Sequence, residues 1–140
     1  MDVLIIEDNR GDVRLLEEAF AQSGSHPTLH IVTDGEQAMQ FLRREQGFAT
    51  VPRPDLVLLD LNLPRKSGLD VLAEVKSDDA LRPIPVIVLT TSRSPQDIRR
   101  VHDLHGNCYI TKPVDLDEFL EIVGLIDRYW LTVVSLPAKD

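Results

Sequence analysis

Five short apolar runs, separated by amphipathic segments, are the feature that most restricts the fold of this 140-residue chain. Each run is four or five residues long, and a polar residue follows it, as is typical of strands in a parallel sheet. The expected strands are residues 3–6, 28–32, 56–59, 86–89 and 108–111. The third run is apolar at every position, so we expect both of its faces to be buried.

Between and after these runs, apolar residues recur three and four positions apart, which is the spacing of an amphipathic helix. Val13, Leu16 and Phe20 follow this spacing in the first such segment. The expected helices are residues 10–21, 36–44, 68–76, 94–105 and 116–129. Five strand–helix units in sequence predict an α/β domain with three layers. Its centre would be a doubly wound, five-stranded parallel sheet with right-handed crossovers.

Charged or hydroxyl-bearing side chains follow the first, third, fourth and fifth expected strands. Glu7 and Asp8 follow the first, Asp60 the third, Thr90 the fourth and Lys112 the fifth. In an open α/β sheet, ligands bind beyond the carboxyl ends of the strands. We therefore expect three carboxylates, one hydroxyl and one ammonium group to converge at one edge of the sheet.

The chemistry of these side chains predicts a magnesium site that receives a phosphoryl group. Two unit charges 4 Å apart repel by roughly 4 kcal/mol at an effective dielectric constant near 20, so protons or a divalent cation must relieve the repulsion. All the candidate ligands are hard oxygens without a nearby His or Cys, which favours Mg2+. Asp60 would be the nucleophile and would form an acyl phosphate, while Mg2+ and Lys112 offset the charge of the transferred group.

The composition argues against several other classes of protein. The formal net charge of −8 disfavours binding to the phosphate backbone of nucleic acids or to anionic membranes. The short, acidic N-terminus does not fit a signal peptide, and no apolar run approaches 18 residues, so we expect a cytoplasmic protein. The single cysteine, Cys108, excludes an internal disulfide.

Four segments of the chain carry a recognisable pattern: IIEDN, LLDLNLPRKSG, VIVLTTS and YITKP. Together, over about residues 2–128, they resemble the receiver domain of two-component response regulators. The resemblance implies a flavodoxin-like fold with strand order 2-1-3-4-5. It also implies a phosphoacceptor signalling protein, not an enzyme, which assists its own phosphorylation and dephosphorylation. We expect residues 1–128 to form the receiver domain and residues 129–140 a C-terminal tail.

The resemblance assigns roles to the acidic residues. Asp60 matches the aspartate that takes the phosphoryl group from a histidine kinase. Asp60 and Asp8 match metal ligands, and Glu7 matches the second acidic position, which acts through a water. The backbone carbonyl of Asn62 matches the remaining protein ligand of the metal.

The resemblance also implies a switch. Thr90 and Lys112 match the hydroxyl and the lysine that contact the phosphoryl oxygens. In the family, Thr90 would move toward the phosphoryl group and an aromatic residue, here Tyr109, would swing inward. This shifts the population of a surface built from the fourth helix, fifth strand and fifth helix. Pro113 matches a structural proline that follows the lysine through a cis bond. Thr91 stands where many relatives have a smaller residue, which would narrow access to the site.

The segments DLHGNCYITKP and YWLTVVSLP resemble the stand-alone response regulators that serve bacterial phytochrome kinases. Stand-alone receivers of the chemotaxis or phosphorelay type, which serve other kinases, are the alternative. The last helix and the tail carry more apolar residues than one core-facing stripe needs, so we expect a homodimer through them. Tyr129 and Trp130 would contribute to that contact. The alternative is that these two side chains and the tail pack onto the core of a monomer.

Two other classes of protein share part of this pattern. A hydrolase of the haloacid dehalogenase type also has a nucleophilic Asp after a strand, but it would want an acid at position 62, which is Asn. A flavodoxin-like flavin carrier would need a phosphate loop rich in hydroxyls and glycine after the first strand. The chain has Glu7, Asp8 and Asn9 there, and the two carboxylates would repel a phosphate.

Overall fold

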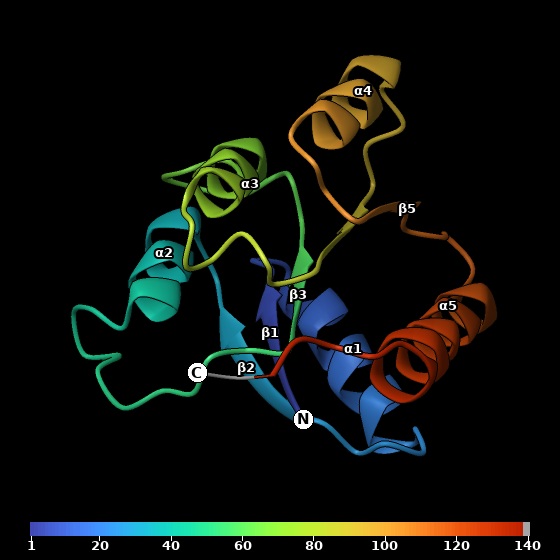
Figure 1. Cartoon of the computed structure of the whole chain (residues 1–140). Helices are drawn as coiled ribbons and strands as arrows, with labels where there is room; N and C mark the ends of the chain where they lie inside the picture. The colour runs from blue at the N-terminus through green and yellow to red at the C-terminus, as the bar shows by residue number, and fades with distance from the viewer. Residues whose placement is uncertain (139–140) are drawn as a thin grey trace.

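The computed structural model describes residues 1–138, whose centre is a five-stranded sheet (Figure 1). The strands are β1 (Asp2–Ile6), β2 (Thr28–Val32), β3 (Leu56–Leu59), β4 (Val86–Thr90) and β5 (Cys108–Thr111). Their order is β2-β1-β3-β4-β5, and each neighbouring pair is parallel. The doubly wound sheet and the strand order expected from the sequence are thereby confirmed.

Within residues 1–138, five α-helices cover the two faces of the sheet. They are α1 (Arg10–Ala21), α2 (Gly35–Arg43), α3 (Gly68–Ser77), α4 (Pro95–Asp103) and α5 (Leu116–Arg128). α1 and α5 pack on one face, and α2, α3 and α4 pack on the other (Figure 1). In β1, Val3 and Ile5 point into the core beneath α1 and α5, whereas Leu4 and Ile6 point into the core beneath α2, α3 and α4. Because successive side chains of a strand point to opposite faces, a strand between two cores must be apolar throughout.

A side-chain cap begins each of these helices. Asn9, Asp34, Ser67, Ser94 and Asp115 each accept a hydrogen bond from a backbone N–H in the first turn. Every one of these helices follows a parallel strand, so its N-terminus lies at the carboxyl edge of the sheet. The caps therefore hold the first turns of the helices at the edge where the functional side chains were expected.

The main departures from the sequence-based expectations are at the ends of α4 and α5 and at the bond before Pro113. α4 ends at Asp103, two residues early, and His105 soon after it has a φ of 65°, in the left-handed region. α5 ends at Arg128, and a short π-helix, η1 (Tyr129–Val133), continues it. The described residues contain no cis peptide bond, so the bond before Pro113 is trans and the implied cis bond is wrong. The trans form is the ordinary one, favoured by about 0.5–1 kcal/mol even before proline.

The tail after α5 runs back past the amino ends of the central strands (Figure 1). Leu131 is buried in the same core as α1 and α5. Pro137 lines a small hollow with Pro54 and Pro85, which precede β3 and β4. The last two residues of the expected tail, 139–140, lie outside the described part of the chain. Among the helices of residues 1–138, none has the length and apolar character needed to cross a membrane.

Gly68, the first residue of α3, leaves no room for a side chain beside the backbone of Asp60. A Cβ there would lie 2.3 Å from the Asp60 carbonyl oxygen and 2.5 Å from the Cα of Leu61. We predict that Gly68→Ala lowers the free energy of unfolding by about 1–3 kcal/mol, because the start of α3 must move away from the end of β3. Urea denaturation measures this change.

Gly124→Ala is the matched control, because a Cβ at Gly124 in α5 meets nothing within 4 Å. It should raise the free energy of unfolding by about 0.5–1 kcal/mol through helix propensity alone. Wild-type stability in Gly68→Ala would mean that the loop after β3 adjusts without cost.

Candidate functional site

Three carboxylates meet where β1 and β3 end. One oxygen from each of Glu7, Asp8 and Asp60 lies within 4.8 Å of the other two. Glu7 and Asp60 are buried and Asp8 is exposed. β1 and β3 are neighbours in the sheet, so the residues that follow them are brought to the same point. This arrangement confirms that the three acidic residues converge, and its hard oxygen donors suit a divalent cation of the Mg2+ type.

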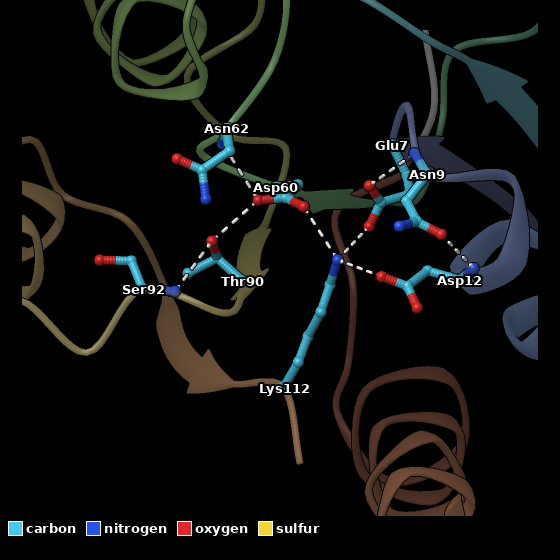
Figure 2. A network of polar contacts seen from close by, with 8 residues as sticks. All are labelled: Glu7, Asn9, Asp12, Asp60, Asn62, Thr90, Ser92 and Lys112. Carbon is cyan, nitrogen blue, oxygen red and sulfur yellow. Dashed lines mark hydrogen bonds and ion pairs between the residues drawn. The ribbon is translucent and has the colours of Figure 1, made fainter. Parts of the chain in front are cut away.

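Lys112, directly after β5, reaches into this cluster and contacts three carboxylates (Figure 2). Its Nζ lies 2.8 Å from Oδ2 of Asp60 and 2.8 Å from Oδ2 of Asp12, and it also donates to Glu7. The ammonium group is almost entirely shielded from water. It therefore supplies a positive charge that the buried carboxylates require.

Both oxygens of Asp60 have hydrogen-bond partners. Oδ1 accepts from the Thr90 hydroxyl at 2.8 Å and from the backbone N–H of Asn62 at 3.0 Å, while Oδ2 accepts from Lys112. Thr90, the last residue of β4, is fully buried. The carboxylate that follows the buried strand β3 is thus stabilised by donors at the ends of the next two strands in the sheet, β4 and β5.

The pKa values of the two buried carboxyl groups move in opposite directions. Burial works to raise the pKa of Asp60, but hydrogen bonds from Lys112, the Asn62 N–H and Thr90 outweigh it, and the pKa falls below its usual value. Burial dominates at Glu7, and the neighbouring Asp60 charge adds to it, so the pKa of Glu7 rises to about 7 despite Lys112. Burial opposes the charge of Lys112, yet its three carboxylate partners raise its pKa. Asp60 is consequently ionised at neutral pH, as a nucleophile must be.

A chain of hydrogen bonds leads from Thr90 into the loop before α4. The Ser92 N–H donates to the Thr90 hydroxyl oxygen at 3.4 Å, and the Tyr109 hydroxyl donates to the Ser92 carbonyl at 2.8 Å. The Ser92 hydroxyl donates to Asp97 in α4 at 2.6 Å. The two residues expected to act as a switch, Thr90 and Tyr109, are therefore joined through Ser92.

Two residues of this site were missed by the sequence reasoning, namely Asp12 and Ser92. Asp12 is the third residue of α1, where an acidic side chain is common because it interacts favourably with the helix N-terminus. That ordinary role conceals its contact with Lys112. The available signal was positional, since the first turn of α1 had to lie at the carboxyl edge of the sheet. No comparable signal marked Ser92 among its neighbouring Thr and Ser residues.

The other expected residues lie around the rim. Asn62 is exposed in the loop after β3, and its N–H contacts Asp60. Thr91 and Pro113 line a pocket of about 170 Å³ together with Asp12 and Lys112. The pocket lies beside the site, so Thr91 lies at the edge of the space through which a phosphoryl donor would reach Asp60.

Comparison with known proteins identifies the family. Residues 3–124 match the model of the response regulator receiver domain. The chain belongs to this family. It is a phosphoacceptor signalling protein of two-component phosphorelay systems and is phosphorylated on an aspartate.

Phytochrome response regulators are among its close relatives. The response regulator Rcp1 of Synechocystis sp. is 44% identical over 136 residues, which cover 97% of this chain and 92% of that protein. The crystal structure of the phosphorylated cyanobacterial phytochrome response regulator RcpA is 48% identical, with a TM-score of 0.95 and 98% of both chains covered. The Mn2+-bound form of Rcp1 has a TM-score of 0.94 at 44% identity, covering 98% of this chain and 99% of that one. The acidic cluster and this metal-bound relative imply a divalent cation, and the family implies a histidine kinase partner.

The raised pKa of Glu7 predicts a pH dependence of stability in the metal-free protein. A carboxyl group with a pKa of about 7 when folded and 4.5 when unfolded stabilises the fold fully below pH 4.5. That contribution is lost as the pH rises through 7. In the presence of EDTA, the free energy of unfolding should therefore fall by up to about 3 kcal/mol between roughly pH 4.5 and 7.

Urea denaturation at a series of pH values measures this slope. Glu7→Gln should flatten it, because glutamine does not titrate, whereas Glu121→Gln on the exposed side of α5 should leave it unchanged. An unaltered slope in Glu7→Gln would show that another group titrates in this range.

Proposed function

We propose that this chain takes a phosphoryl group on Asp60 from a histidine kinase and signals through the phosphorylated form. The observation that carries the proposal is the setting of Asp60. It is a buried carboxylate that holds the Thr90 hydroxyl and the Lys112 ammonium and lies beside the oxygens of Glu7 and Asp8. An Asp60 oxygen attacks the phosphorus of a phosphohistidine, and an acyl phosphate forms. The phosphorus–nitrogen bond breaks, and the imidazole leaves with the electron pair.

Mg2+ is the cation that we propose for the acidic cluster. Asp8 and Asp60 would bind it directly, Glu7 through a water, and Asn62 through its backbone carbonyl. The hard oxygen donors and the absence of His or Cys from the cluster support this choice. When bound, the ion offsets the negative charge of the transferring phosphoryl group.

Lys112 and Thr90 would serve the phosphoryl group after transfer. Lys112 would donate a hydrogen bond to one phosphoryl oxygen, and the Thr90 hydroxyl would turn from Asp60 to another. This movement withdraws the acceptor that now holds the Ser92 N–H. Because Ser92 also binds Tyr109 and Asp97, the loop before α4 would rearrange together with Tyr109. The surface formed by α4, β5 and α5 would then carry the signal.

We infer that the partner is a phytochrome-type histidine kinase and that both proteins work in the cytoplasm. The support is the likeness to RcpA, a phytochrome response regulator, at 48% identity over 98% of both chains. Transfer to Asp60 from a purified, autophosphorylated phytochrome kinase tests the pairing. A chemotaxis-type kinase assayed in parallel should transfer the group more slowly.

A homodimer through α5 and the tail is the proposed form of assembly, with residues 1–128 as the receiver domain and 129–140 as the tail. Leu125, Tyr129 and Val133 are 58%, 57% and 66% exposed, which leaves large apolar side chains in water. A pocket of about 460 Å³ lies beside them, lined by Ile110, Ile122, Leu125, Ile126, Tyr129 and Trp130. Part of the apolar surplus serves the fold itself, since Leu131 is buried. The exposed remainder favours a contact with a second copy.

Asp60→Asn should abolish phosphorylation. Incubation of the wild type with acetyl phosphate and magnesium should give one acid-stable, base-labile adduct, read by intact mass, because Asp60 is the ionised nucleophile of the cluster. Asp55→Asn, which changes an aspartate at the opposite end of β3, should keep the adduct. An undiminished adduct in Asp60→Asn would refute the assignment.

Sedimentation at micromolar concentrations tests the dimer. The wild type should run near twice the monomer mass, and a Leu125→Ala, Tyr129→Ala double variant should shift toward the monomer. Truncating central interface side chains of this kind costs about 2 kcal/mol or more of binding free energy. Both residues are exposed, so the fold should persist. Val114→Ala, at a side chain 98% exposed in the loop before α5, is the control and should stay dimeric. A monomeric wild type would contradict the proposal.

A further inference from the structure

The ammonium group of Lys112 has three N–H donors, and three carboxylates from different parts of the fold accept from it (Figure 2). Glu7 follows β1, Asp60 follows β3, and Asp12 lies in the first turn of α1. A long lysine side chain has high rotamer entropy, and such a contact set holds it in one position. Each of the three carboxylates therefore contributes to the placement of Nζ.

Two of these carboxylates also have a role in cation binding or phosphoryl transfer. Glu7 and Asp60 belong to the cluster that suits a divalent cation, and an oxygen of Asp60 becomes bonded to phosphorus after transfer. Asp12 is not a member of that cluster. Its contact with Lys112 is accordingly the one that neither the cation nor the phosphoryl group has to displace.

The position of Asp12 is itself well supported. Its backbone N–H donates to the capping side chain of Asn9 at 3.0 Å, so the first turn of α1 is held in place. In Figure 2, Asp12 approaches the ammonium group from the side away from Thr90. Its side chain is 26% exposed, whereas Glu7 and Asp60 are buried, and it lines the pocket of about 170 Å³ that flanks the site.

We propose that Asp12 is a positioning residue that keeps Lys112 within reach of the phosphoryl group while Glu7 and Asp60 are engaged with the cation. The inference rests on the proposed roles of Asp60 and Lys112. Without Asp12, the lysine of the metal-loaded protein loses its remaining fixed acceptor and samples other rotamers. Transfer then has to wait for the productive one.

The test measures phosphorylation of the whole chain by acetyl phosphate at saturating magnesium, followed by intact mass. Asp12→Ala should slow uptake about tenfold, and Asp12→Glu, which restores a carboxylate, should recover most of the rate. Asp70→Ala is the matched control. Asp70 holds the same third position in the first turn of α3, with its N–H capped by Ser67, but makes no contact with Lys112. Its rate should equal that of the wild type.

Two further measurements separate positioning from a general structural effect. In a Lys112→Ala background, Asp12→Ala should cause no further loss, because the group that it positions is gone. Magnesium affinity by calorimetry should change less than twofold in Asp12→Ala, whereas Asp8→Asn should weaken it about tenfold or more.

The outcomes are distinguishable. A wild-type rate in Asp12→Ala, or an equal loss with and without Lys112, would overturn the role of Asp12 and leave the proposed function intact. Absence of an adduct on Asp60 in the wild type would overturn the proposed function and this inference together.

Discussion

The contact between Asp60 and Lys112 is the interaction on which the site depends. Two opposite charges are buried at the ends of β3 and β5, two strands apart in the sheet, and neither would be tolerated there alone. Thr90, on the strand between them, completes the hydrogen bonding of the carboxylate. The order of the strands thus decides which side chains can meet, and a different order would leave a buried charge without a partner.

The same arrangement explains the opposite behaviour of the two buried acids. Burial disfavours the charge of both acids, and both accept a hydrogen bond from Lys112. Asp60 also accepts from Thr90 and from the Asn62 N–H, so its pKa falls. At Glu7, burial and the neighbouring Asp60 charge outweigh Lys112, so its pKa rises to about 7. The metal-free site therefore holds more negative charge than one lysine can balance. A divalent cation is the means by which such a site can keep all its carboxylates ionised.

How far the sequence predicts this molecule depends on the range of the interactions. The strands and the convergence of Glu7, Asp8, Asp60, Thr90 and Lys112 follow from apolar periodicity and from the rule that parallel strands end at one edge. Asp12 and Ser92 were not predicted, because their roles depend on how the first turn of α1 and the loop before α4 approach Lys112 and Thr90 in space. The end of α5 was not predicted either, since η1 continues its apolar pattern with a different hydrogen-bond spacing. The cis bond expected before Pro113 was wrong, and that expectation rested on the family resemblance alone.

The tail, which runs past the amino ends of the central strands, restricts how α5 can move when the site is phosphorylated. Beyond its C-terminal end, Leu131 is buried in the core, and Pro137 lines a small hollow together with the prolines that precede β3 and β4. Its N-terminal end follows a loop in which Val114, two residues after Lys112, is almost wholly exposed. The first turn of α5 is held by the Asp115 cap and by Phe119, which is buried in the core. Because both ends of α5 are fixed to the core, we expect the exposed loop between Lys112 and α5 to absorb most of a displacement that begins at the site.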